Sequence, residues 1–124
     1  MSALRDAGWL RDCEVLYWGD LDTHGFGILD QLRAVHPHVS SVLMDDATLL
    51  AHRDAWSKDF TPSRAVLGQL SVEEARVYGG LQSGSYGERV RLEQELIGWE
   101  WATKEFGRIA LPYAVQIPYT RVRR

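Results

Sequence analysis

The sequence predicts an α/β fold, a parallel β-sheet flanked by helices, and two observations carry this prediction. The run Val15–Trp18 holds four strand-forming residues without a polar break, which is typical of a strand buried on both faces. From Val15 to Met44 the patterns follow the order strand, loop, helix, strand, with short connections. The two strands of such a unit are expected to be parallel, with a right-handed crossover.

The composition is that of one ordinary globular domain and excludes several classes of protein. The chain has 124 residues, of which 45% are hydrophobic and 25% are charged. No stretch approaches the roughly 18 apolar residues of a membrane-spanning helix, and the N-terminus lacks the apolar segment of a signal peptide. Cys13 is the only cysteine, so a disulfide framework and a cysteine zinc site are excluded. We therefore expect a cytoplasmic protein with no membrane partner.

The net charge of −3 bears on the kind of partner that the chain could bind. This is not the overall charge of a protein that wraps nucleic acid by itself. DNA chemistry stays open, because a metal site built from carboxylates is itself acidic. A partner or a further domain would then supply the basic surface.

The first half of the chain holds the elements of the strand–helix–strand unit. Ser2–Leu10 has apolar residues at helical spacing, which predicts a short helix, or the end of a longer one, before the first strand. After that strand, the loop 20–25 leads to a helix over residues 25–36, whose apolar residues recur at intervals of three and four. Pro37 stops this helix. Val39–Met44 is the predicted second strand.

The second half of the chain is predicted to be mainly helical, with an irregular stretch and a turn between the helices. A capping aspartate, a capping box and a broad apolar face indicate the three helices. The first helix runs from Asp45 or Asp46 to about Trp56, and an irregular stretch follows over 58–69. The second helix is opened by Ser71 and Glu74 and ends near Gln82, or already at Gly79–Gly80. The third is a long helix, Glu88–Arg108, with a weak point at Gly98. Residues 1–111 are expected to form one partial α/β domain, and residues 112–124 an extended or disordered basic tail.

Two aspartates follow the first strand, where α/β sheets bind their ligands. Asp20 and Asp22 stand two residues apart, between Gly19 and Gly25. Two neighbouring carboxylates repel each other, and a hard divalent cation such as Mg²⁺ removes that conflict. The glycines let a phosphate chain approach the backbone closely. An alternative of equal weight is that one aspartate caps the helix at Phe26 and the other forms an Asx-turn.

Three segments of the chain resemble a known family. Tyr17–Phe26 resembles the D-x-D segment of a Toprim domain and, more narrowly, the C-terminal domain of JetD, the nuclease subunit of Wadjet anti-plasmid defence systems. That family is related to the A subunit of topoisomerase VI. The likeness continues through Leu43–Arg53 and Glu88–Glu95, in the same order, and covers Val15 to about Trp101.

The resemblance implies a Toprim-like (Rossmann-like) fold and Mg²⁺-dependent cleavage of DNA phosphodiester bonds, with Mn²⁺ as a substitute cation. In Toprim enzymes the D-x-D aspartates bind the metal, so Asp20 and Asp22 take that catalytic role here. A glutamate on an earlier strand completes the Toprim site, and neither that strand nor an upstream DNA-binding domain has a counterpart in this sequence. We therefore expect a sheet that lacks its first strand, and a chain that is inactive or very weak alone.

The resemblance also implies partners. Double-stranded DNA would bind through the full-length protein, and the subunits of an SMC-like complex would contact the domain. A second copy of the chain is a further candidate, because the missing strand would leave a sheet edge open.

Other residues near the D-x-D loop are candidates for supporting roles. His24 could touch a phosphate or donate to a leaving oxygen, and a loop histidine bound to the backbone is the alternative. The resemblance raises Glu93 as an extra acidic metal ligand, whereas on a solvated helix Arg91 would pair with Glu95. The candidate contacts to DNA phosphate are Gly25, Arg53 and Arg91.

Two other functions stay open from the sequence. The pattern Asp20-Leu21-Asp22-Thr23 also fits a haloacid-dehalogenase-like phosphatase, in which Asp20 attacks phosphorus and Asp22 acts as the acid. Asp45–Asp46 would then stand for the later acidic pair of such an enzyme, although they follow closely and no lysine lies between. The other function is a non-catalytic interaction module of an SMC-like complex, in which the acidic loop has no chemical role.

Overall fold

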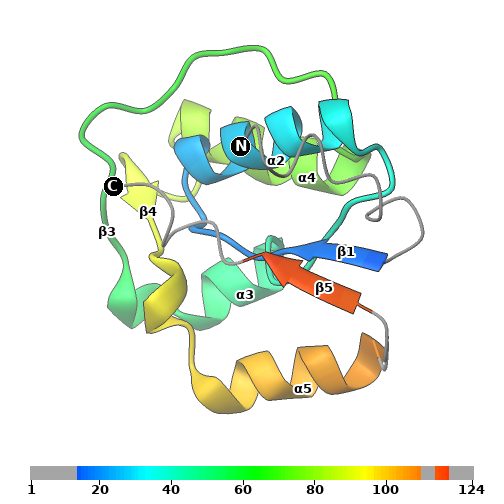
Figure 1. The fold of residues 1–124 in the computed structure, drawn as a ribbon. Helices are drawn as coiled ribbons and strands as arrows, with labels where there is room; N and C mark the ends of the chain where they lie inside the picture. Colours follow the sequence, from blue (N-terminus) through cyan, green and yellow to red (C-terminus); the bar gives the residue numbers. More distant parts are fainter. Residues whose placement is uncertain (1–13, 110–113, 118–124) are drawn as a thin grey trace.

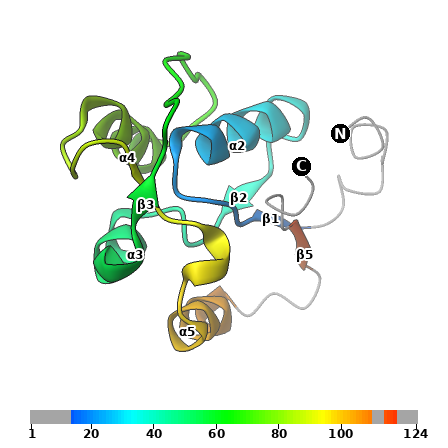
Figure 2. The ribbon, with the colours of Figure 1, turned by 90° about the vertical axis from the view of Figure 1, so that its left-hand side faces the viewer.

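A three-stranded parallel sheet lies between two layers of helices (Figures 1 and 2). The computed structural model describes residues 14–109 and 114–117. The strand order is β2-β1-β5, with β1 (Glu14–Tyr17) in the middle. Helices α2 (Thr23–Val35) and α4 (Val72–Ser83) lie on one side of the sheet, and α3 (Asp46–Ala51) and α5 (Trp99–Ile109) lie on the other. The predicted α/β class is confirmed, and the arrangement is consistent with a Toprim-like fold.

The strand–helix–strand unit forms as predicted, with a shorter second strand. β2 (Ser40–Ser41) pairs in parallel with β1, so that Leu16 lies opposite Ser40 and Tyr17 lies opposite Ser41. The strand was predicted to continue to Met44. It ends early because Leu43 has a left-handed backbone, with φ +63°, which turns the chain away from the extended path.

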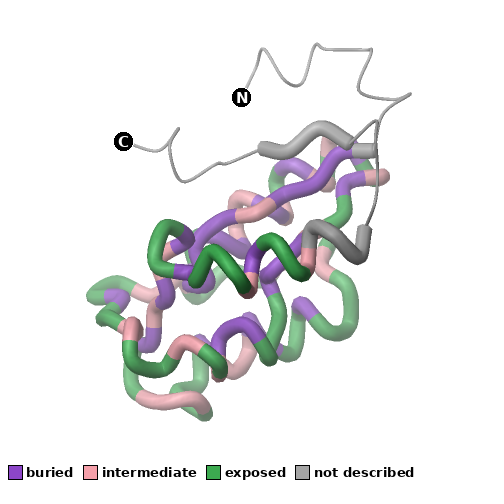
Figure 3. Tube along the Cα trace, turned by 90° about the horizontal axis from the view of Figure 1, so that it is seen from below, coloured by how far each residue is buried: buried purple, intermediate pink, exposed green. Residues whose placement is uncertain are grey.

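The core surrounds β1 and includes residues from the helices on both sides of the sheet in Figure 1. Val15 and Tyr17 are fully buried, as expected for a strand covered on both faces. Figure 3 shows the buried residues running along this strand. Fully burying one large apolar side chain contributes about 1.5–3 kcal/mol. The helices contribute Phe26, Leu29 and Leu32 from α2, and Val77, Tyr78 and Leu81 from α4. This packing holds the start of α2 against the sheet.

Two helices begin where capping side chains predict them. Asp45 caps α3 and accepts a hydrogen bond from the Thr48 N–H at 2.8 Å. At the start of α4, Ser71 and Glu74 form a capping box, in which each side chain accepts a hydrogen bond from the other residue's backbone N–H.

α3 ends earlier than predicted, whereas α4 ends within one residue of the predicted Gln82 and not at the earlier alternative Gly79–Gly80. α3 stops at Ala51 and a 3₁₀ turn, η2 (Arg53–Ala55), replaces the helix predicted to reach Trp56. α4 passes through Gly79–Gly80 and ends at Gly84, which has φ +82°. Gly80 lies inside the helix, and the Tyr86 ring packs so closely on it that a Cβ there would lie 2.5 Å from the ring.

The predicted long helix Glu88–Arg108 is wrong in its first half, which holds a turn, a short strand and a 3₁₀ turn. β4 (Val90–Arg91) pairs antiparallel with β3 (Ser57–Lys58), which lies at the edge of the stretch predicted to be irregular. Val90 and Leu92 are buried with Arg91 between them, which is the two-residue period of a strand. Arg89 has φ +56°, a value that a helix does not allow.

Only the last part of that stretch is helical. A 3₁₀ turn, η3 (Gln94–Leu96), follows β4, and α5 begins at Trp99, directly after the glycine named as the weak point. The predicted helix places the apolar residues of the whole stretch on one face. They belong instead to a strand, a turn and a shorter helix.

The described part of the tail is a strand of the central sheet. β5 (Ala114–Ile117) pairs in parallel with β1, from Glu14 opposite Ala114 to Tyr17 opposite Ile117. The boundary predicted at residue 111 places this strand outside the domain, whereas the pairing places it inside. It also gives β1 a neighbour on each side. The predicted helix Ser2–Leu10 lies outside the described residues. Over residues 14–109 and 114–117, no helix has the length and apolar character needed to cross a bilayer.

Candidate acidic site at the carboxyl end of strand β1

The D-x-D loop leaves β1 and turns directly into α2. The side chains of Asp20 and Asp22 are buried there, with 3% and 1% of each residue exposed. The Tyr17 hydroxyl donates to the Gly25 carbonyl at 2.9 Å and so closes the loop. A Cβ at Gly25 would lie 2.0 Å from the backbone oxygen of Asp20, so only glycine fits at this position. The close approach predicted for a phosphate is here an approach of the chain to itself.

Asp22 caps α2, as the alternative from the sequence predicted. Its Oδ1 accepts a hydrogen bond from the Gly25 N–H at 2.6 Å. Its second oxygen, Oδ2, faces away from the helix and lies 3.2 Å from the Nε of Arg91. The capping role therefore engages one oxygen of this carboxylate and leaves the other to a charged neighbour.

Asp20 is bound by a segment that is remote in sequence. Its Oδ1 accepts a hydrogen bond from the Gln94 N–H at 2.7 Å. Leu21 and Leu92 form an antiparallel bridge with hydrogen bonds of 2.8 and 3.1 Å, and this bridge places residues 91–94 beside the loop. The Asx-turn expected for one of the two aspartates is replaced by this long-range contact.

Arg91 lies across both carboxylates. Its Nε lies 3.2 Å from Asp22 Oδ2, and its Nη2 lies 3.5 Å from Asp20 Oδ2. The arginine side chain is 32% exposed, while the two carboxylates are almost completely buried. The pairing with Glu95 that a helix would have produced is therefore wrong. The predicted contact of Arg91 with DNA phosphate stays a prediction.

Burial raises the pKa of Asp22 above its ordinary value. The negative charges of Asp20 and Asp59 act in the same direction. The hydrogen bond from Gly25 and the positive charge of Arg91 act against it and do not cancel it. Keeping the Asp22 carboxylate ionised in this buried loop therefore costs free energy.

Asp59 is a third buried carboxylate at this end of the molecule, and the sequence did not indicate it. Its Oδ2 accepts a hydrogen bond at 3.0 Å from the hydroxyl of Thr23, the residue that follows Asp22 in the sequence. The same hydroxyl oxygen accepts from the Ser63 N–H at 2.7 Å. No local pattern marks Asp59, which lies in the stretch predicted to be irregular. Only its burial against α2 reveals it.

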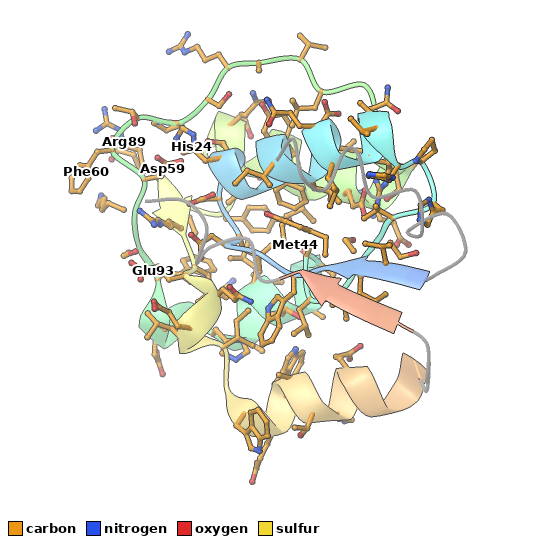
Figure 4. The ribbon with its side chains drawn as sticks, in the orientation of Figure 1. His24, Met44, Asp59, Phe60, Arg89 and Glu93 are labelled. Atoms are coloured by element: carbon orange, nitrogen blue, oxygen red, sulfur yellow. The ribbon has the colours of Figure 1, made fainter. Side chains whose placement is uncertain are left out.

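His24 lies beside Asp59 at the start of α2 (Figure 4). Its Nε2 is 2.7 Å from the Thr61 carbonyl oxygen and 3.5 Å from Asp59 Oδ1. Because a carbonyl oxygen only accepts, the Nε2 of His24 is assigned as the donor. This contact is the one expected for a loop histidine bound to the backbone, which was the alternative to a catalytic role. The His24 side chain is 44% exposed. A role of His24 towards a phosphate stays a prediction.

The other predicted site residues lie in separate surroundings. Glu93 is half-buried and directly precedes η3. It therefore does not lie within a helix, which is where the sequence predicted it. Arg53 is exposed on η2, and its guanidinium lies 5.7 Å from the centre of the Trp56 ring. Their roles as metal ligand and phosphate contact stay predictions.

The aspartates after the second strand have structural partners. Asp45 caps α3, and Asp46 accepts a hydrogen bond from the Tyr86 hydroxyl at 2.6 Å. Partial burial and the contact with Asp46 raise the pKa of Tyr86 to about 12. The later acidic pair of the phosphatase alternative is therefore engaged in holding α3.

The chemistry of the two D-x-D carboxylates suits a hard cation, but the described residues do not make a complete Mg²⁺ site. Mg²⁺ prefers oxygen ligands in near-octahedral geometry. One oxygen of each carboxylate accepts a backbone N–H, and the other faces the positive charge of Arg91. Within residues 14–109 and 114–117, no three His, Cys, Asp or Glu side chains form a group that could hold a metal ion.

The comparison with known families agrees with the segments that carry the resemblance. A family model described as "Wadjet protein JetD, C-terminal" matches residues 1–106, which is most of the chain. No curated protein matches the chain.

Proposed function

The chain belongs to the JetD C-terminal family of Wadjet proteins, and on this premise we propose that it carries part of the active site of a Mg²⁺-dependent DNA endonuclease. The observation that supports this most directly is the pair of buried carboxylates, Asp20 and Asp22, at the carboxyl end of the central strand. The Toprim-type chemistry implied by the resemblance needs acidic side chains at this edge of the sheet.

The electrostatics of the loop support a functional role for these carboxylates. Burying a carboxylate is costly unless its charge is compensated. Here one guanidinium faces two carboxylates, and Asp59 adds a third negative charge nearby. Groups with pKa values perturbed by burial and by like charges occur often at functional sites.

In this proposal Asp20 and Asp22 are two of the acidic ligands of a composite Mg²⁺ site. Their Oδ2 atoms are the ones that point away from the backbone hydrogen bonds. The remaining ligand is the glutamate of the Toprim pattern, for which the described residues offer no counterpart. The isolated chain is then inactive or very weak, because charge stabilisation in phosphoryl transfer depends on a complete metal site.

The proposed substrate is double-stranded DNA, and the proposed partners are the subunits of an SMC-like complex. With a net charge of −3, the chain does not supply the basic surface that DNA binding requires. Upstream parts of the protein or its partners would supply that surface. His24, Gly25 and Arg91 are the proposed contacts to phosphate at the site, and Arg53 on η2 is a proposed contact outside it.

Cleavage of a supercoiled plasmid tests this function. A longer JetD-family protein that includes this domain should nick or linearise the plasmid with Mg²⁺ or Mn²⁺, and the 124-residue chain alone should not. Asp20→Asn and Asp22→Asn should abolish cleavage in the longer protein, while Asp30→Asn on the outer part of α2 should not. Undiminished cleavage by the Asp20→Asn and Asp22→Asn variants would refute the proposal. Strong nicking by the chain alone that is lost in Asp22→Ala would refute the need for the upstream glutamate.

A further inference from the structure

Arg91 occupies the position that a cation would take on the two D-x-D carboxylates. Asp20 and Asp22 each accept a backbone N–H with Oδ1 and face Arg91 with Oδ2. The labelled Arg89 and Glu93 in Figure 4 flank Arg91 in the sequence and locate its strand. The oxygens on which a metal ion would bind are therefore the same oxygens that hold the guanidinium.

We propose that Arg91 is the resident counter-cation of this site and competes with any divalent cation for it. A guanidinium does not lose its proton in proteins, so its positive charge is permanent. A divalent cation on the same two oxygens would lie within a few ångströms of that charge and be repelled. Metal binding at Asp20 and Asp22 thus requires that the Arg91 side chain move away.

The surroundings of Arg91 allow this movement without a change of backbone. Its backbone is held in β4, opposite Ser57, and the next residue is bridged to Leu21. The side chain is one-third exposed, so it has an open side towards solvent. Long arginine side chains change rotamer on a much shorter timescale than the backbone rearranges. Arg91 is therefore a positioning residue that controls access of the metal to the carboxylates.

This inference rests on the proposed metal role of Asp20 and Asp22, but its test requires neither DNA nor catalysis. Mn²⁺ is titrated into the 124-residue chain by calorimetry, and the same titration is made on Arg91→Gln. Removal of the competing charge should tighten Mn²⁺ binding by about tenfold, within the usual range of coupling between two ligands. Arg76→Gln, which removes an exposed arginine on α4, is the matched control and should bind as the parent chain does.

Two further variants assign the effect to charge and to this site. Arg91→Lys keeps a positive charge and should bind Mn²⁺ as weakly as the parent chain. Asp20→Asn with Asp22→Asn, introduced into Arg91→Gln, should remove the gained binding. Equal Mn²⁺ affinity of Arg91→Gln and the parent chain, including no binding by either, would overturn the competition. A lysine variant that binds as tightly as the glutamine variant would also overturn it.

A second measurement on the unsubstituted chain covers the case in which Arg91→Gln does not fold. The Nε–H resonance of Arg91 responds to the charge beside it, and this nitrogen lies 3.2 Å from Asp22 Oδ2. Titration with Mg²⁺ should shift this resonance in step with metal binding at the D-x-D loop. Metal-dependent shifts of the Asp20 and Asp22 signals without any change at Arg91 would overturn the inference, and so would no shift at any of the three. Failure of plasmid cleavage in the longer protein would refute the proposed nuclease but leave this competition standing.

Discussion

Asp20 accepts a hydrogen bond from the backbone N–H of Gln94, a residue 74 positions further along the chain, at 2.7 Å. The bridge between Leu21 and Leu92 holds the same two segments together. The candidate site is therefore made of two remote parts of the sequence, and its geometry depends on the packing of β4 against the D-x-D loop. A substitution in residues 91–94 should therefore alter the geometry of the D-x-D loop, and the reverse should also hold.

Gly25 should tolerate no side chain, because a Cβ there would lie 2.0 Å from the backbone oxygen of Asp20. Gly25→Ala should therefore lower the free energy of unfolding by about 3 kcal/mol or more. Gly27 lies one half-turn further along α2 and a Cβ there would meet nothing within 4 Å. Gly27→Ala should stabilise the chain by up to about 1 kcal/mol through helix propensity. Urea unfolding measures the free energy of unfolding of both variants. Equal effects of Gly25→Ala and Gly27→Ala would contradict the close approach of Gly25 to the backbone oxygen of Asp20.

Asp22 should contribute to stability through its cap as well as to the site through its charge. Asp22→Ala removes the acceptor of the Gly25 N–H and should lower the free energy of unfolding by about 1–2 kcal/mol. Asp22→Asn keeps an oxygen in the same place and removes the charge beside Asp20, so it should cost much less. Urea unfolding separates the two variants. If alanine and asparagine were equally destabilising, the cap would not be the source of the loss.

Glu74 should make the stability of the chain depend on acid pH. Burial raises the pKa of Glu74, but hydrogen bonds from the Arg33 guanidinium, the Ser41 hydroxyl and the Ser71 N–H outweigh this and hold the pKa below its ordinary value. A lowered pKa means that the folded state favours the carboxylate more than the unfolded state does. The stability that Glu74 contributes is therefore complete above about pH 4.5 and is lost as the pH falls through the folded-state pKa.

The difference in unfolding free energy between the parent chain and Glu74→Gln checks this dependence. It should be largest near pH 7 and should shrink as the pH falls below 4.5. Glu73→Gln alters the exposed neighbour on the same turn of α4 and should show no such change. A parent-to-Glu74→Gln difference that stays constant from pH 7 to pH 3 would show that the ion pair with Arg33 contributes nothing to acid sensitivity.

His52 should hold the start of α5 against α3. Its Nδ1 lies 2.7 Å from the Thr48 carbonyl, and its Nε2 accepts from the Gly98 N–H at 2.9 Å. His52→Ala removes that acceptor and should destabilise the fold by about 1–2 kcal/mol. Hydrogen exchange at the Gly98 amide should become faster, whereas Lys104→Ala, at an exposed position of α5, should leave it unchanged. Unchanged exchange in His52→Ala would rule out this contact as the anchor of α5.

The features that the sequence predicted correctly all have short-range causes. Val15–Trp18 is an unbroken apolar run, and residues 25–36 follow one helical period, so strand and helix form where local patterns place them. The capping box of Ser71 and Glu74 is likewise complete within four residues. The D-x-D loop was located because it directly follows a buried strand.

The long helix predicted over residues 88–108 failed for the opposite reason. Val90 and Leu92 are buried by pairing with β3 and with Leu21, which are more than 30 residues away in the chain. Over a short stretch, apolar residues at mixed spacing fit a helix and a strand about equally well. The partner strand decides between them, and no pattern within the stretch encodes that partner.

The α/β class, the position of the acidic loop and the first turn of the helix after it were all determined by the amino-acid sequence, because each depends on contacts within a few residues. The tertiary structure alone decided what surrounds the two carboxylates. Arg91 and Gln94 reach them through the Leu21–Leu92 bridge, and Asp59 reaches the neighbouring Thr23 from another loop. Groups that lie 36 to 74 positions apart in the sequence come into contact only after the strands have paired, so the electrostatics of this site are a property of the folded chain.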